Sequence, residues 1–454
     1  MREIISLNEN WTLSFPKGER PTEQVTLPHT WNAVDGMDGN GSYLRTTGVY
    51  TRTFTQPKQP LTGGRTYVEV LAAALAATVK VNGQVATTHE GGFSIFRADV
   101  TDLCHEGDNE LTIEVSNEDT PSMYPASADF TFYGGLYRGV NLISVPGTHF
   151  DLDYFGGPGI KVTPKPTEDG GATFEIESWV TNGEEAYTVM YSIEDCYGNE
   201  VASGVRPCDS TKVTLYVPDA QLWSMDEPNL YTVTARLQKN NETFDEIYAN
   251  VGVRSYTVTP NDGFSINGVP TPLRGVARHQ DRLYKGNALT AEDHYEDAML
   301  IKELGANTIR LAHYQHSQDF YDACDELGFA VILGAELRFP ENDNDYLVYG
   351  IDEDWLRSHP YMCCTSAREF YEKFHNDVLI IHAHPYRDGN LTVFEDAVHG
   401  SEIINGNPRH DNHNDLALEL CRRHPDFYRL AGSDTHQDGD EARAGVILPE
   451  RVHD

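Results

Sequence analysis

The sequence predicts a multidomain protein in which two all-β domains precede a domain of alternating strands and helices. Up to about residue 258, short runs that alternate between apolar and polar residues are separated by turn residues, which is typical of antiparallel sheets. After "GVRSYTV", helical runs alternate with strand-like runs, and this alternation indicates a parallel sheet or a barrel. The length of 454 residues is enough for about three such domains.

The two all-β domains are expected over about 1–150 and 151–258. Strand-like runs of the first include "RTYVEVLA", "NELTIEV" and "YRGVNLISV". The stretch "VNGQ" at Val81–Gln84 predicts a hairpin, because Asn-Gly tolerates the positive φ of a type I′ turn. A break falls near "FGGPG", and the following runs "ATFEIESWVTN", "YTVMYSIEDCYGN" and "NLYTVTARLQ" predict a second β-sandwich.

The third domain opens with a predicted helix, "TAEDHYEDAMLIKELGA". Thr290 is its expected N-cap with Asp293 three residues on, and Gly305 ends it. The run "NTIRLAH" predicts a strand, and "SQDFYDACDELG" predicts a helix that Gly328 ends. Further strand-like runs end in polar residues: "FAVILGAEL", "DVLIIHAHP", "VHGSEIING" and "YRLAGSDTH", with the helix "DLALELCRRH" between the last two.

Composition excludes several classes of function. The formal net charge of -36 argues against nucleic-acid binding, where Lys and Arg neutralise phosphates. The seven cysteines are scattered, so we do not expect a disulfide framework. We expect instead a reducing, cytoplasmic compartment. No apolar run reaches ~18 residues and the N-terminus lacks an apolar leader, so neither a membrane partner nor secretion is expected. A homo-oligomer remains open.

Four stretches of the first three quarters of the chain resemble glycoside hydrolase family 2, the β-galactosidase-like family. They are "LPHTWNAVDGMDGNGSYLRTTGVYTRTF", "DFTFYGGLYRGVNLI", "DGFSINGVPTPLRGVARHQD" and "NTIRLAHYQHSQDFYDACDELGF", in that order. The resemblance implies a hydrolase of carbohydrate metabolism with a β-galactoside or a related sugar as its ligand. It also implies a sugar-binding jelly roll over 1–150, an immunoglobulin-like sandwich over 151–258 and the first strands of a TIM barrel over 259–333.

Candidate sugar-binding residues follow the first two barrel strands. Arg278, His279 and His313 lie where barrel enzymes place functional side chains, and their N–H groups can hydrogen-bond sugar hydroxyls. The resemblance implies that His279 and His313 contact the sugar, that Asp129 reaches in from the jelly roll, and that Asn40 belongs to the same rim. For either histidine alone, a structural role at the end of a strand is the alternative.

The later part of the barrel departs from that family. Retaining glycosidases need two carboxylates about 5–5.5 Å apart, one as acid/base and one as nucleophile. In the family both are Glu on later barrel strands, the first within an Asn-Glu pair. No such pair occurs in a family-like context after residue 330, so we name no catalytic residue. We expect little or no hydrolysis of glycosides.

From Gly334 onward the motifs resemble the C-terminal part of a PHP (polymerase and histidinol phosphatase) domain, a metal-dependent phosphoesterase. The ordered set is "GAEL", "HAHPYRDG", "HGSEIINGN" and "GSDTH" over 334–454. Imidazoles and carboxylates at strand ends suit Zn, Mn or Fe ions, which activate water against a phosphate ester. A surface histidine before a proline, or a helix-capping Asp, explains each motif singly. The resemblance implies metal ligands at Glu336, His384, Glu402, Asp434 and His436.

The stretch "GFAVILGAELRF", Gly328–Phe339, can form the third strand of either barrel. The α/β barrel is therefore expected to be hybrid or incomplete. A hybrid would place His279 and His313 at the same rim as Glu336 and His384, giving a metal-dependent phosphoesterase. An accidental join of two genes would leave an incomplete barrel with exposed sheet edges. A non-catalytic carbohydrate-binding protein is the third reading, and the PHP opening motif H-x-H is absent.

Overall fold

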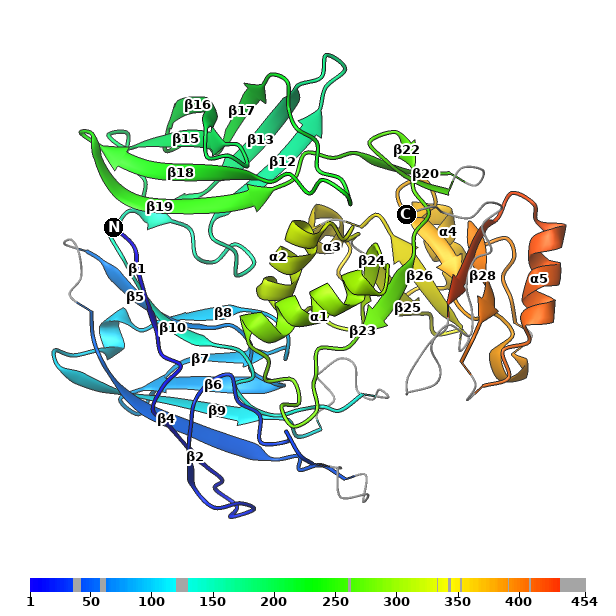
Figure 1. Cartoon of the computed structure of the whole chain (residues 1–454). Helices are drawn as coiled ribbons and strands as arrows, with labels where there is room; N and C mark the ends of the chain where they lie inside the picture. Colours follow the sequence, from blue (N-terminus) through cyan, green and yellow to red (C-terminus); the bar gives the residue numbers. More distant parts are fainter. Residues whose placement is uncertain are drawn as a thin grey trace. The chain divides into compact units, whose positions relative to one another are not determined.

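The computed structural model divides the chain into two compact units, which Figure 1 shows together. The first unit comprises Met1–Ser255 and Arg278–Phe329, and the second comprises Tyr256–Ala277 and Ala330–Asp454. The described residues are 1–35, 42–57, 63–119, 130–259, 263–332, 334–341, 344–351, 353–390, 392–407 and 410–432. No helix within these ranges is long and apolar enough to cross a membrane. The cysteines, all in described ranges, are free thiols, as the sequence predicts.

The first domain is a sandwich of two antiparallel sheets. One sheet has the strand order β3-β2-β4-β9-β6-β7, and the other has the order β1-β10-β5-β8. Trp11 of one sheet and Val68 of the other are fully buried in one shared core. The strands are β1 (Glu3–Ser6), β2 (Trp11–Ser14), β3 (Glu23–Val25), β4 (Thr47–Thr55), β5 (Arg65–Val70), β6 (Ala76–Val81), β7 (Gln84–Glu90), β8 (Phe96–Asp99), β9 (Asp108–Ser116) and β10 (Val140–Val145), with a 3₁₀ turn at Thr101–Leu103.

The hairpin predicted at "VNGQ" is present. β6 ends at Val81 and β7 begins at Gln84, and the two strands pair antiparallel. Asn82 and Gly83, at φ 51° and 77°, make the connection. Both central residues therefore have the positive φ that a type I′ turn requires.

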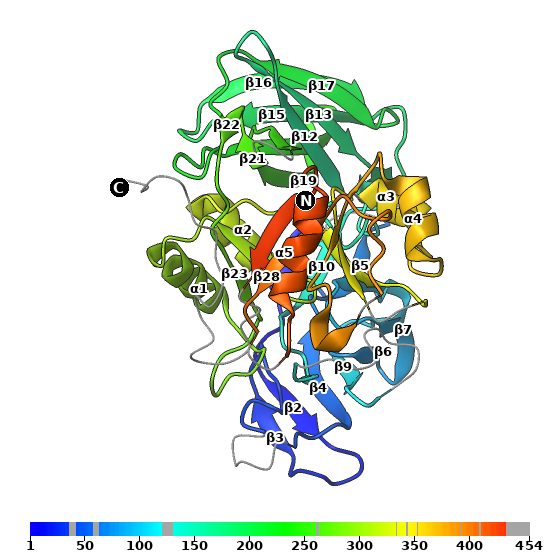
Figure 2. The ribbon, with the colours of Figure 1, turned by 90° about the vertical axis from the view of Figure 1, so that its right-hand side faces the viewer.

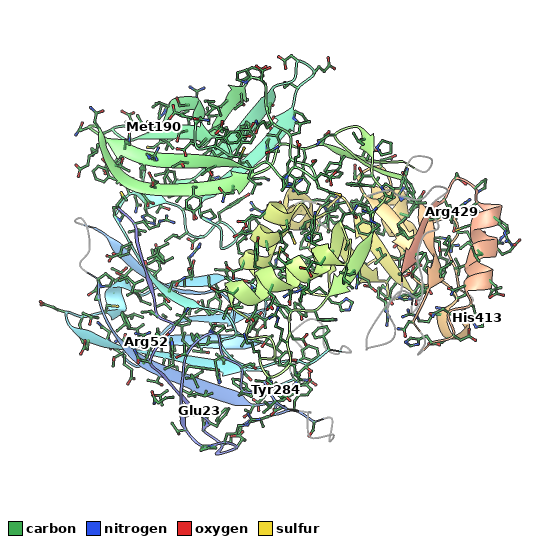
Figure 3. All side chains as sticks on the ribbon, viewed as in Figure 1. Glu23, Arg52, Met190, Tyr284, His413 and Arg429 are labelled. Atoms are coloured by element: carbon green, nitrogen blue, oxygen red, sulfur yellow. The ribbon has the colours of Figure 1, made fainter. Side chains whose placement is uncertain are left out.

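The second domain is also a two-sheet sandwich, as predicted (Figure 2). Its sheets have the orders β12-β13-β17 and β16-β15-β18-β19, and Phe174 and Tyr191 from opposite sheets are fully buried in its core. Figure 3 shows side chains on both of its sheets, Met190 among them. The strands are β12 (Ile160–Pro166), β13 (Ala172–Ser178), β15 (Thr188–Glu194), β16 (Glu200–Pro207), β17 (Lys212–Val217), β18 (Tyr231–Lys239) and β19 (Glu242–Val251), with the short pair β11 (His149–Phe150) and β14 (Val180–Thr181).

The helices predicted after residue 290 form where expected. Helix α1 (Ala291–Glu303) starts with a capping box, in which Thr290 accepts from the Asp293 backbone and Asp293 accepts from the Thr290 backbone. Strand β24 (Thr308–Leu311) follows, and α2 (Gln318–Leu327) ends at Gly328. Gly328 has φ 76°, and a Cβ there would meet the Met225 carbonyl oxygen at 2.3 Å, so glycine is required for two reasons.

The second unit contains a five-stranded sheet with the order β25-β26-β27-β28-β29. Helices α3, α4 and α5 accompany it, and α5 packs on β28. The chain enters α5 after His413, which Figure 3 labels. The elements are β25 (Gly334–Arg338), β26 (Asp345–Tyr349), α3 (Glu353–Ser358), α4 (Ala367–Phe374), β27 (Leu379–His382), a 3₁₀ turn (Arg387–Gly389), β28 (Gly400–Asn405), α5 (Asn414–Arg423) and β29 (Tyr428–Gly432), preceded by β20 (Tyr256–Thr259), β21 (Gly263–Ile266), β22 (Val269–Pro270) and β23 (Gly275–Arg278).

The expectation of an all-parallel sheet after residue 330 is wrong in part. β26, which the sequence analysis missed, pairs antiparallel with both β25 and β27, whereas β27, β28 and β29 pair parallel. The cause is the short connection from Arg338 to Asp345. A parallel return needs a crossover of about a dozen residues or more, so this connection permits only a hairpin.

Candidate functional site

Aromatic and histidine rings gather in the first unit beside the first barrel strands. His279 directly follows β23, and His313 lies two residues after β24. Their ring centroids are 5.3 Å apart, and the Phe130 ring lies 5.6 Å from His279 and 6.1 Å from His313. We call Phe130, His279, His313 and Tyr314 the ring cluster. The structure therefore brings together the two histidines that the sequence analysis selected.

The ring cluster is open to solvent on one side. His313 is exposed, and Phe130, His279 and Tyr314 are half-buried. The Tyr314 ring stacks on Phe93 at 4.4 Å, and its hydroxyl lies 3.4 Å from Nδ1 of His279. Apolar ring faces next to imidazole nitrogens suit a ligand with both C–H faces and hydroxyls, such as a sugar.

Arg278 is a buried structural residue and does not line the open face of the ring cluster. Its side chain is 6% exposed, and it forms an ion pair with Asp297. Its guanidinium also lies 3.1 Å from Nδ1 of His294 and 3.1 Å from Nδ1 of His316, and it covers the Phe320 ring at 4.0 Å. Each guanidinium nitrogen thus has a partner inside the unit. The predicted role of Arg278 in direct sugar contact gains no support from this placement.

The two histidines under Arg278 are held neutral. Burial, and then the Arg278 charge, lowers the pKa of His294 to about 4 and that of His316 to about 3. A neutral imidazole can accept the Arg278 N–H through Nδ1, and Nε2 of His316 faces the Ala312 carbonyl oxygen at 3.4 Å. A protonated imidazole has no acceptor for Arg278, so the network requires the neutral form.

Two predicted sugar residues lie outside the described residues, and two aromatic members of the cluster were missed. Asp129 and Asn40 fall in ranges that the structure does not describe. Phe130 directly follows Asp129 in "DFTFYGG", and Tyr314 directly follows His313 in "HYQH". Both stand inside motifs that resemble family 2, so their position next to Asp129 and His313 in the chain was the signal that could have found them.

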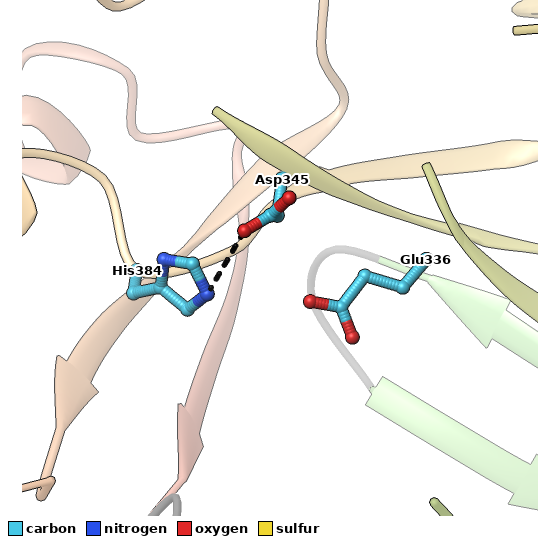
Figure 4. A group of neighbouring side chains, drawn as sticks. All are labelled: Glu336, Asp345 and His384. Carbon is cyan, nitrogen blue, oxygen red and sulfur yellow. Dashed lines mark ion pairs between the residues drawn. The ribbon is translucent and has the colours of Figure 1, made fainter. Parts of the chain in front are cut away.

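In the second unit, three potential metal ligands meet on one face of the sheet (Figure 4). Glu336 comes from β25, Asp345 from the start of β26 and His384 from the loop after β27. Their ligand atoms all lie within 4.8 Å of one another, and Nε2 of His384 is 3.7 Å from Oδ2 of Asp345. We call these three residues the acidic-histidine cluster. Two carboxylates and an imidazole are donors that fit Zn, Mn or Fe ions.

Glu402 is placed beside the acidic-histidine cluster as a support. Its Oε2 accepts a hydrogen bond from the His384 backbone N–H at 2.8 Å and one from Nδ2 of Asn405 at 3.2 Å. Glu402 thus holds the loop that carries His384. The other two predicted ligands, Asp434 and His436, lie outside the described residues.

The two histidines of "HAHP" have opposite environments. His382 pairs in register with Tyr346, its ring stacks on Tyr346 at 5.0 Å, and it is fully buried. Both of its ring nitrogens lack a hydrogen-bond partner among the described residues, and burial lowers its pKa to about 3. Tyr346 lies in the apolar core of the unit, so its partner His382 faces the core as well. Only His384 therefore belongs to the acidic-histidine cluster.

Three models of one family match most of this chain. Residues 4–146 match "Glycosyl hydrolases family 2, sugar binding domain", 158–254 match "Glycosyl hydrolases family 2", and 258–376 match "Glycosyl hydrolases family 2, TIM barrel domain". Across residues 4–376 the chain belongs to this family. The barrel match of this family 2 chain continues past Gly334, where the sequence analysis placed a change of family.

Relatives of this family 2 chain include named glycosidases. A "Beta-glucuronidase" of Bacteroides fragilis is 33% identical over 74% of the chain and 50% of the relative. The crystal structure of an FMN-binding beta-glucuronidase from Facaelibacterium prausnitzii L2-6 is 85% identical over 73% of the chain and 52% of the other, with a TM-score of 0.72. The structure of Bacteroides uniformis beta-glucuronidase 2 shares the fold, with a TM-score of 0.74. It is 22% identical, and the match covers 94% of this chain and 59% of the other. The chain spans about half the length of the curated relatives it matches.

Proposed function

We propose that the first unit binds a β-glycoside, with β-glucuronides and β-galactosides as the candidate ligands. The observation that carries this proposal is the ring cluster, in which Phe130, His279 and His313 present ring faces and nitrogen atoms on an open surface. The names of the relatives, beta-glucuronidase and beta-galactosidase, support these two sugar classes. Asp129 and Asn40, which lie outside the described residues, stay candidate sugar-binding residues on the family resemblance alone.

Replacing His313 or Phe130 by alanine is expected to weaken binding of a nitrophenyl β-glucuronide or β-galactoside. Each change removes one aromatic or hydrogen-bonding contact, which contributes about 1 kcal/mol, so the dissociation constant should rise several-fold. Isothermal titration calorimetry of the full chain measures this. His105→Ala, an exposed histidine elsewhere in the first unit, is the matched control.

Two outcomes of that titration separate the alternatives. If neither sugar binds the wild-type chain, the proposal fails. If a sugar binds and neither His279→Ala nor His313→Ala changes its affinity, the ligand is held by the first domain alone, as in a non-catalytic carbohydrate-binding protein. We expect little or no hydrolysis of either nitrophenyl glycoside, since no Asn-Glu pair occurs in a family-like context after residue 330. Sustained release of nitrophenol would contradict that expectation.

A second candidate function, which we propose for the second unit, is that of a metal-dependent phosphoesterase segment in a hybrid barrel. The acidic-histidine cluster favours it, because its donor atoms lie close enough to share an ion. Glu336 and His384 would hold the ion, and Glu402, Asp434 and His436 are the further candidates. A bound ion of this kind supplies Lewis acidity and lowers the pKa of bound water. Glu402 would keep the His384 backbone in place.

Removing His384 is the test of this second function. The full chain, purified without chelator and exposed to Mn or Zn, is expected to retain at least one ion, and His384→Ala is expected to lose it, because an imidazole ligand is removed. Elemental analysis measures both. The exposed His375→Ala is the matched control. Less than about 0.1 metal per chain in the wild type would end the proposal, since an assembled site should bind such ions well.

A further inference from the structure

We propose that Asp345 is a ligand of the same divalent ion as Glu336 and His384, and that Arg338 competes with the ion for Asp345. This inference rests on the metal site proposed above. The motifs in the sequence did not indicate Asp345. It enters through β26, the antiparallel strand that only the structure shows.

The strand register places Asp345 and Glu336 on one face of the sheet. Glu336 of β25 pairs with Leu347 of β26, and partners in a ladder point to the same face. Asp345 lies two residues before Leu347, so its side chain also points to that face. Tyr346, between them, is fully buried on the opposite face, in the core of the unit. The alternation thus separates the metal-ligating face from the apolar face.

The three donor atoms already lie nearly close enough together to bind one ion, so ion binding would need only small side-chain movements. Donors of a tetrahedral ion with bonds of about 2.1 Å lie about 3.4 Å apart. Nε2 of His384 is already 3.7 Å from Oδ2 of Asp345, and all three donor atoms lie within 4.8 Å. Both side chains are shielded, with 15% of His384 and 14% of Asp345 exposed. The His384 backbone is fixed by its hydrogen bond to Glu402.

Arg338 holds Asp345 from the solvent side. Its Nε donates to Oδ1 of Asp345 at 2.8 Å and its Nη2 donates to Oδ2 at 2.7 Å, while the Arg338 side chain is 57% exposed. A carboxylate has further lone pairs, so these hydrogen bonds leave room for an ion. The guanidinium charge nevertheless repels a dication a few Å away. Arg338 therefore lowers the affinity of the site for the ion, and its removal should raise it.

A pair of the same type outside the acidic-histidine cluster supplies the control. In the same unit, Nε and Nη2 of Arg368 donate hydrogen bonds of 3.0–3.2 Å to the carboxylate oxygens of Asp396. Neither residue belongs to the acidic-histidine cluster. A change that acts only by breaking an arginine–carboxylate pair should therefore have the same effect at Asp345 and at Asp396.

The experiment titrates Zn²⁺ into the full chain after chelator treatment, by calorimetry. We expect Asp345→Asn to weaken binding at least about tenfold, because a neutral amide replaces a charged ligand. Arg338→Gln should bind several-fold more tightly, and Asp396→Asn and Arg368→Gln should bind as the wild type does. Asp345→Glu, which keeps the charge, should retain most of the affinity. Circular dichroism of each variant shows whether the sheet is still formed.

The other outcomes assign failure to one proposal or the other. Normal affinity of Asp345→Asn, with loss of Zn²⁺ in His384→Ala, overturns the role of Asp345 and leaves the metal site standing. Weaker binding by Arg338→Gln overturns the competition, since Arg338 would then only position Asp345. A wild type that binds no Zn²⁺ overturns this inference and the metal site together. Equal losses for Asp345→Asn and Asp396→Asn also overturn the inference, because they indicate a general effect of broken ion pairs.

Discussion

The Arg278→Ala variant is expected to lose about 2–6 kcal/mol of stability in the first unit, because it leaves two buried neutral histidine nitrogens without their hydrogen-bond donor. The change removes the ion pair with Asp297 and the donors that face His294 and His316. It also opens a cavity over the Phe320 ring, on which the guanidinium lies. Arg282 still pairs with Asp297, so the losses fall mainly on the two histidines.

Hydrogen exchange is the measurement, because it reports on α1 and α2 separately from the two sandwiches. Amides of Ala291–Glu303 and Gln318–Leu327 should exchange faster in Arg278→Ala than in the wild type. Arg206→Ala, which removes an exposed arginine from the second sandwich, is the control and should leave both helices unchanged. Exchange in Arg278→Ala no faster than in the control would show that the network contributes little.

Acidification below pH 6.5 is expected to destabilise the same region steeply. The folded chain holds His294 and His316 neutral, with pKa values of about 4 and about 3, whereas an unfolded histidine has a pKa near 6.5. Between these values the unfolded chain binds more protons than the folded chain, so stability falls as pH falls. The contribution of each histidine is complete above pH 6.5 and is lost progressively as the pH falls, down to about pH 4 for His294 and about pH 3 for His316. In that window each histidine lowers the equilibrium constant for folding roughly tenfold for each unit by which the pH falls.

Glutamine variants test that origin of the acid sensitivity. The double variant His294→Gln/His316→Gln keeps side-chain oxygens that can accept hydrogen bonds from Arg278, but these amides do not titrate. The double variant should therefore unfold at lower pH than the wild type, as measured by the exchange rates of α1 amides between pH 6.5 and pH 4. His105→Gln, which changes an exposed histidine, should follow the wild type. If the wild type and the double variant lose protection in parallel, other groups cause the acid sensitivity.

Local sequence patterns were sufficient for the elements with short-range signals. Asn82 and Gly83 could be placed in a turn, and Thr290 and Gly328 at helix ends, because caps and tight turns depend on φ values and hydrogen bonds within a few residues. β26 was missed because its run "DYLVY" is short and stands in a polar context. That omission concealed Asp345, since the sequence offered no strand on which to place it.

The sequence by itself determined the two β-sandwiches, the first helices of the barrel and the family of the chain before Gly334, because alternation, caps and ordered motifs are written in consecutive residues. The family match to residue 376 contradicts the change of family that the motifs predicted at Gly334. It also selected His279, His313, Glu336 and His384 by residue type at strand ends. Only the tertiary structure decided which neighbours these residues have. The register of β25, β26 and β27 turned Asp345 towards Glu336 and His384, and His382 towards the core. Burial made Arg278 part of the framework, since a guanidinium removed from water must find its partners within the protein.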